Sequence, residues 1–191
     1  KSGKDKFWFG EIGGGTGNDD RFIAAPKVFY YSKDLSMNLL LNSNNIGDPP
    51  LSRRDFYRFG GGFNNLNART GTSINISSDD AGITELQNNR AKSIDAQFGA
   101  YNFSYSPTES LEFSGFAIYS RAENHLEEKN TRTYNVSNEV EETSEISVQD
   151  TEQELYKFSA EFNPNETLQT EYNLLYKTSS QEEVSDLTTI S

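Results

Sequence analysis

The sequence predicts an all-β protein, a segment of an antiparallel transmembrane β-barrel, and three observations support this fold class. Segments of about ten residues alternate apolar and polar side chains, as in 35–44, where Leu35, Met37, Leu39 and Leu41 recur at every second position. Aromatic residues make up 13% of the chain, although only 34% of its residues are hydrophobic. No apolar run approaches the ~18 residues of a membrane helix. A period of two over about ten residues is typical of barrel strands with one lipid-facing side.

The first three predicted strands follow each other through short connections. The first, 6–15, opens on aromatic residues and ends in three glycines, which allow a barrel wall to bend. The second, 21–31, alternates apolar residues with small or polar ones. A turn of Ser, Lys and Asp at 32–34 joins it to the third strand, 35–44.

The remaining four strands form two predicted hairpins. Strands 91–105 and 111–123 are joined by a turn that contains proline. Strands 153–163 and 167–178 are joined by an Asn-Pro-Asn turn. Proline and asparagine are residues that tight turns favour, so both pairs are expected to be antiparallel neighbours.

Two long connections, 45–90 and 124–152, are expected to be loops. Ten carboxylates lie between residues 123 and 154, and a run of like charge usually stays solvated. Short and long connections then alternate as in outer-membrane barrels, whose short turns are periplasmic and whose long loops are extracellular. Because bacterial barrels have an even number of strands and at least about eight, seven strands predict an internal piece of a longer protein.

The alternation assigns side chains to two faces of the predicted wall. The residues expected to face lipid are Val28, Met37, Leu39, Leu41, Phe98, Phe158 and Leu174. The residues expected to face the lumen are Lys27, Asn38, Asn42, Asp95, Lys157 and Glu171. The same pattern also fits a water-soluble β-sandwich, in which the aromatic residues form the core and the polar residues the solvated face.

Composition argues against other classes of function. With 29 acidic and 17 basic residues the net charge is -12, which disfavours a nucleic-acid partner. The chain has no cysteine, and His125, its only histidine, is expected to be an exposed loop residue. The glycine triplets lack the Lys-Ser/Thr that a phosphate-binding loop requires. We therefore predict a protein that is not an enzyme, with no catalytic residue, no cofactor and no metal site.

A small basic cluster lies in the first long connection. Arg53, Arg54 and Arg58 fall within 51–59, an amphipathic stretch that could form a short loop helix. Two interpretations remain open, a plain surface helix and a loop that captures ligand at the mouth of the barrel.

Several motifs resemble a known family. Phe7-Trp-Phe-Gly-Glu-Ile12 leads into Gly13-Gly-Gly-Thr-Gly-Asn-Asp-Asp-Arg21, followed by Leu39-Leu-Leu-Asn-Ser-Asn-Asn-Ile-Gly47 and Arg54-Asp-Phe56. In this order they resemble the barrel of the TonB-dependent receptor-like outer-membrane proteins of Bacteroidota, the outer membrane beta-barrel family. The resemblance spans roughly residues 7–131. It implies a barrel of about 22 strands in the bacterial outer membrane, with lipid, the TonB energy-coupling complex and a surface lipoprotein as partners.

Three functions follow as hypotheses. The first is ligand uptake by gated passage through an outer-membrane barrel. The second is a structural or accessory barrel in a surface-protein secretion or adhesion complex. The third is a soluble cell-surface β-sandwich that binds glycans.

Overall fold

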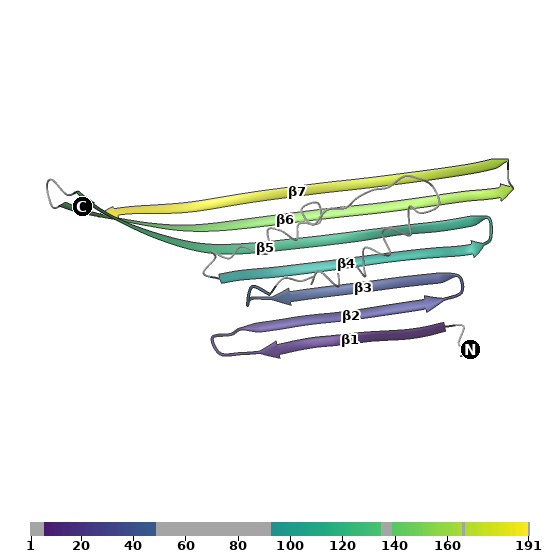
Figure 1. Cartoon of the computed structure of the whole chain (residues 1–191), viewed down its shortest axis with the longest axis horizontal. Helices are drawn as coiled ribbons and strands as arrows, with labels where there is room; N and C mark the ends of the chain where they lie inside the picture. The colour runs from purple at the N-terminus through teal and green to yellow at the C-terminus, as the bar shows by residue number, and fades with distance from the viewer. Residues whose placement is uncertain (1–5, 49–92, 135–138, 166, 191) are drawn as a thin grey trace.

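The structure, a computed structural model, describes residues 6–48, 93–134, 139–165 and 167–190. They form one seven-stranded antiparallel sheet, which confirms the predicted all-β fold class (Figure 1). The strands are β1 (Lys6–Thr16), β2 (Phe22–Ser32), β3 (Leu35–Asn44), β4 (Ser93–Thr108), β5 (Leu111–Tyr134), β6 (Glu139–Asn165) and β7 (Leu168–Ile190). Each strand pairs with its neighbours in the chain, so β1 and β7 are the two edges of the described sheet. The described residues include no helix long and apolar enough to cross a membrane.

The largest departure from the predicted elements is the hairpin of β5 and β6. The predicted loop at 124–152 is wrong, because β5 continues to Tyr134 and β6 begins at Glu139. Backbone hydrogen bonds hold this ladder, and opposite charges such as Arg132 and Glu141 face each other across it. β7 pairs with β6 along most of the same length. An acidic composition is therefore compatible with long paired strands.

The other predicted loop, 45–90, lies largely outside the described residues. The basic cluster of Arg53, Arg54 and Arg58 lies outside them as well, so its two interpretations stay predictions. Only 45–48 is described, and it forms a bend after β3.

Asn45 fastens this bend to the connection between β1 and β2. Its side-chain oxygen accepts a hydrogen bond from the Phe22 backbone N–H at 2.7 Å, and its amide donates to the Asp20 carbonyl at 3.0 Å. Asp19 and Asp20 have φ values of 57° and 56°, the pair of left-handed residues that a type I′ turn requires. These hydrogen bonds thus join the 13–21 motif to the 39–47 motif.

Register and alternation divide the sheet into two faces. We call one the buried face, because the buried side chains of β3 to β6 all lie on it. Its apolar core includes Leu40, Phe98, Phe116, Ile118 and Leu155. We call the other the aromatic face.

Most predicted face assignments agree with this division. Val28, Met37, Leu39, Leu41, Phe158 and Leu174 share the aromatic face, and Lys27, Asn38, Asn42, Lys157 and Glu171 share the buried face.

Strand β4 is turned over relative to its prediction. Phe98, grouped with the lipid-facing residues, lies on the buried face opposite Asn42 and is 3% exposed. Asp95, grouped with the lumen-facing residues, lies on the aromatic face. Both assignments are wrong for one reason. β4 carries apolar side chains on the buried face over 94–100 and on the aromatic face over 101–105, and a shift of one residue inverts every assignment in a strand.

Candidate functional site: an aromatic belt and an acidic extension

An uncharged belt crosses the aromatic face over all seven strands. It consists of Trp8, Gly10, Ile12, Gly14 and Thr16 in β1; Phe22, Ala24, Pro26, Val28, Tyr30 and Ser32 in β2; Leu35, Met37, Leu39, Leu41 and Ser43 in β3; Gly99, Tyr101, Phe103 and Tyr105 in β4; Leu111, Phe113, Gly115, Ala117 and Tyr119 in β5; Tyr156, Phe158, Ala160 and Phe162 in β6; and Thr170, Tyr172, Leu174 and Tyr176 in β7. Since 24% of the chain is charged, an average surface of this size would carry several charges. The belt carries none.

Aromatic rings pair across strands within the belt. The ring centroids of Trp8 and Tyr30 are 4.5 Å apart, and those of Tyr156 and Tyr176 are 6.1 Å apart. These side chains are open to the surroundings, and Trp8 is 65% exposed. A continuous exposed apolar surface of this kind requires a covering of lipid or protein.

The belt runs obliquely to the rows of paired residues. One edge of the belt contains Phe22 in β2 and Tyr176 in β7. The row of paired residues that starts at Phe22 reaches β7 at Glu182, which lies six residues beyond Tyr176. A shift of six residues at ~3.3 Å each, over five strand spacings of ~4.8 Å, corresponds to an angle of about 40°. The opposite edge, from Ser32 to Phe162, shifts by two residues over four strand spacings and corresponds to about 20°.

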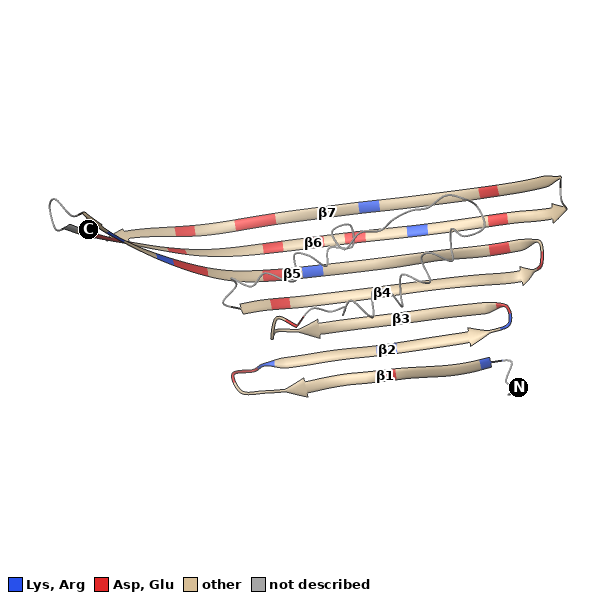
Figure 2. Ribbon diagram, viewed as in Figure 1, with Lys and Arg blue, Asp and Glu red and all other residues tan. Residues whose placement is uncertain are grey.

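Beyond the belt, β5, β6 and β7 continue as a three-stranded acidic extension. We define it as residues 121–134, 140–154 and 178–190. It has twelve carboxylates and three basic side chains, so its net charge of -9 accounts for most of the chain's -12. Figure 2 shows these carboxylates gathered along the long ends of the three strands, away from β1 to β3.

One ion pair lies where the extension meets the belt. Arg121 donates two hydrogen bonds to the Asp150 carboxylate, from Nε at 3.1 Å and from Nη2 at 2.6 Å. These hydrogen bonds hold the pKa of Asp150 below its ordinary value, against a smaller opposing effect of burial. They also raise the pKa of Arg121. Asp150 therefore stays ionised, and two strands are joined by a bidentate contact.

The buried face interleaves its apolar core with amides. Asn38 donates to the Asn102 side-chain oxygen at 2.7 Å. Asn44, which is 1% exposed, donates to the Asn42 side chain at 2.8 Å and accepts from the Asp48 backbone N–H at 3.1 Å. The bonds of Asn42 and Asn44 satisfy polar groups that would otherwise be costly to bury, whereas Asn38 Oδ1 and Asn102 Nδ2 are buried without a hydrogen-bond partner among the described residues.

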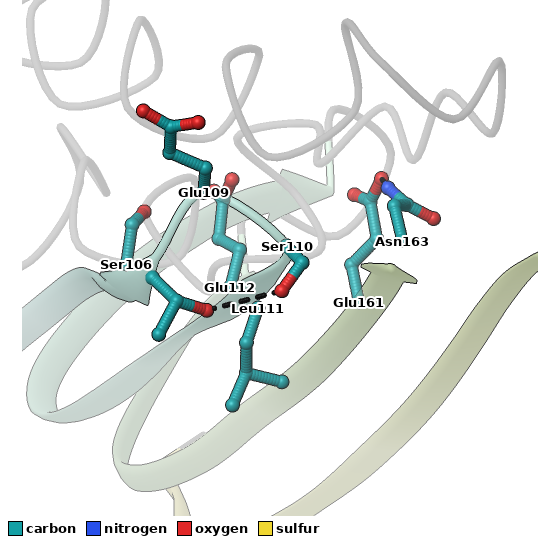
Figure 3. A pocket seen from close by; sticks show the side chains of 8 residues that line it. Ser106, Glu109, Ser110, Leu111, Glu112, Glu161 and Asn163 are labelled. Carbon is teal, nitrogen blue, oxygen red and sulfur yellow. Dashed lines mark hydrogen bonds between the residues drawn. The ribbon is translucent and has the colours of Figure 1, made fainter. Parts of the chain in front are cut away.

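A polar cavity of about 430 Å³ lies beside the β4–β5 turn, at the end of the sheet away from the acidic extension (Figure 3). Glu112 and Glu161, which face each other across β5 and β6, line it together with Ser106, Ser110 and Asn163. Asn163 donates a hydrogen bond to Glu161, and Ser104 donates to Glu112 at 3.4 Å. The cavity presents three carboxylates, those of Glu109, Glu112 and Glu161, together with serine and threonine hydroxyls, and the described residues that line it include no histidine, cysteine or lysine.

Sequence reasoning missed the extension and the apolar core of the buried face. A signal for the extension was present, because Val140, Ile146 and Val148 recur at even positions within the acidic run and Thr131 and Thr133 alternate in the strand opposite. The charge of the run outweighed this alternation. Comparison of the chain with protein-family models, curated proteins and solved structures found no match.

Proposed function

We propose that this chain forms part of the wall of a bacterial outer-membrane β-barrel that takes up a ligand by gated passage. The observation that carries the proposal is the uncharged belt on one face of a sheet in a strongly acidic chain. In water such a surface is unfavourable, whereas in a bilayer it is the face that lipid covers.

The height of the belt supports this environment. From Leu111 to Tyr119 it covers eight residue steps of β5, about 26 Å along the strand. With a tilt of about 40°, this length corresponds to a height of about 20 Å, to which the side chains at both ends add. Outer-membrane barrels carry an apolar band about 25 Å tall, with aromatic residues at its borders.

The slope of the belt is an independent support. A water-soluble sheet has no reason to place its apolar residues along an oblique line, whereas a barrel strand tilts by about 35–45° to the membrane normal. The belt of a tilted strand must therefore move along the strand from one neighbour to the next. The angle of about 40° obtained from the edge between Phe22 and Tyr176 falls in this range.

The buried face supports gated passage over an open pore. A water-filled channel is lined by polar side chains, but here Leu40, Phe98, Phe116 and Ile118 form an apolar core on the inward side. A lumen of this composition packs against protein, so a ligand can pass only when that packing is rearranged. The same packed face also favours the second hypothesis, an accessory barrel without transport.

Leu174 and Leu175 provide a matched test of the membrane assignment. They are adjacent in β7, 54% and 52% exposed, and lie on the aromatic and the buried face respectively. In lipid, Leu174→Arg is expected to lower the free energy of unfolding by about 2–4 kcal/mol, because arginine replaces a lipid-facing residue. Leu175→Arg is expected to cost less, although it places a cation opposite Lys157.

The measurement is urea unfolding of the complete barrel refolded in lipid vesicles, followed by the loss of β-sheet circular dichroism, because the seven described strands alone leave two unpaired edges. Repulsion from Lys157 adds to the cost of Leu175→Arg. A greater loss of stability in Leu174→Arg would therefore be found in spite of this repulsion. An equal cost at the two positions, or a greater cost at Leu175, would contradict a lipid-facing belt.

A further inference from the structure

We propose that Asp95, Glu123 and His125 form a binding site for a divalent transition metal such as Zn²⁺ on the aromatic face, beyond the belt. Their ligand atoms all lie within 4.8 Å of one another. The three residues come from two strands that pair directly, so the backbone ladder sets their spacing.

Register explains why these side chains converge. Asp95 in β4 stands opposite Glu123 in β5, and His125 follows Glu123 on the same face two residues later. The His125 Nε2 and a Glu123 carboxylate oxygen are 2.9 Å apart. Ligand atoms bound at about 2.0–2.2 Å from one zinc ion are separated by similar distances, so small side-chain rotations suffice to close the site.

The charges of the site are unbalanced without a cation. Two carboxylates directly opposite each other in neighbouring strands destabilise a sheet. The guanidinium of Arg121, two residues before Glu123 on the same face, is held by Asp150, and Asp95 has no ion pair among the described residues. A bound divalent ion would compensate both carboxylates at once.

The donor set selects the class of metal. An imidazole nitrogen together with carboxylate oxygens suits Zn²⁺ and related transition metals, whereas Ca²⁺ and Mg²⁺ prefer oxygen alone. His125 is the only histidine of the 191 residues, and among the described residues it falls in the one group of three metal-binding side chains. Three protein ligands on an exposed surface leave the remaining coordination positions to water.

The test is zinc binding by the full chain refolded in detergent micelles. Titration with ZnCl₂ is followed by calorimetry and by the NMR signals of the imidazole, which arise from a single residue. We expect one site per chain and a shift of the imidazole signals at one equivalent. CaCl₂ is expected to bind at least about tenfold more weakly, because it does not use the imidazole.

Three variants distinguish the site from general electrostatic attraction. His125→Gln and Asp95→Asn each remove a ligand and are expected to weaken zinc binding at least about tenfold. Glu182, which stands opposite Asp150 on the same face, is not one of the three ligands. Glu182→Gln therefore removes one negative charge but no ligand, and the affinity of this variant for zinc should stay within about twofold of that of the unchanged chain.

The imidazole signals are read on the unchanged chain, so they remain informative if a variant does not refold. Absence of an imidazole shift with zinc, an equal loss in Asp95→Asn and Glu182→Gln, or calcium binding as tight as zinc binding would each overturn the proposal.

Discussion

At the scale of single residues, the contact between Phe103 and Gly115 shows how the belt is packed. The Phe103 ring covers Gly115, and a Cβ added at Gly115 would lie 3.0 Å from the ring and 2.5 Å from the Lys157 carbonyl oxygen. An aromatic side chain across a strand glycine is a recurrent means of covering an exposed backbone. The glycine is therefore required by its neighbours and not by its backbone conformation.

Gly115→Ala is expected to lower the free energy of unfolding by about 1–3 kcal/mol, because the new methyl group must displace backbone or ring. The control is Gly99→Ala on the same face, whose Cβ would meet only the Leu41 side chain at 3.4 Å. Both are measured by urea unfolding in the same vesicles. If both variants lose the same stability, the close packing around Gly115 is not what the structure indicates.

Residue-scale prediction from sequence succeeded where a strand has one apolar face. Leu39 and Asn38 each share a face with most members of their predicted group, because only one parity of β3 is consistently apolar over 35–39. Phe98 and Asp95 are assigned wrongly because β4 has apolar residues on both faces. Alternation alone cannot resolve that case, and only pairing with β3 and β5 does.

At the scale of elements, the Arg121–Asp150 pair ties β5 to β6 where the belt ends. The pKa of Asp150 is lower in the folded state than its ordinary value of 3.8, mainly because of the hydrogen bonds from Arg121. The stability that the pair contributes is therefore fully present above about pH 3.8 and is lost as the pH falls through the lower folded-state pKa.

We expect the difference in unfolding free energy between the unchanged chain and Asp150→Asn to be constant from neutral pH to slightly above pH 3.8, and to shrink below it. Urea unfolding at a series of pH values measures it. The double variant with Arg121→Gln completes the comparison, and the coupling between the two substitutions should vanish at the acidic end. A coupling that persists at low pH would show that the pair contributes by packing and not by charge.

Element boundaries were predictable where turns carry proline or asparagine, as at the two hairpin turns of β4–β5 and β6–β7. The predicted end of the fifth strand at Glu123 is wrong, because local composition indicates a loop where strand pairing continues β5. The acidic run favours a loop by composition, but its described residues have hydrogen-bonding partners in neighbouring strands.

At the scale of the whole molecule, the exposed belt and the two open edges decide how the chain behaves in solution. β1 and β7 each pair on one side only among the described strands, which leaves two rows of backbone groups unpaired. We expect the isolated chain to aggregate in water and to dissolve in detergent or lipid with the circular dichroism of a β-sheet. Analytical ultracentrifugation with and without detergent measures this. A soluble monomer with a cooperative thermal transition in plain buffer would favour the glycan-binding β-sandwich hypothesis instead.

Gated passage predicts a difference between the two faces in cells. Phe98→Ala opens the apolar core of the buried face, whereas Phe158→Ala makes the same truncation on the aromatic face. In the complete barrel, Phe98→Ala should increase sensitivity to bulky hydrophilic antibiotics that the outer membrane excludes, and Phe158→Ala should not. Equal sensitivity of the two variants at matched expression would favour the accessory-barrel hypothesis over gated passage.

Alternation and turn residues, which are local properties of the chain, were enough to predict the all-β class, seven strands and the apolar parity of most of them. Strand pairing was needed to establish the orientation of β4, the length of the β5–β6 hairpin and the proximity of Asp95 to Glu123 and His125. These features depend on register between strands, which is a relation between distant segments. Backbone pairing sets register, and side-chain composition constrains it only where one face is clearly apolar.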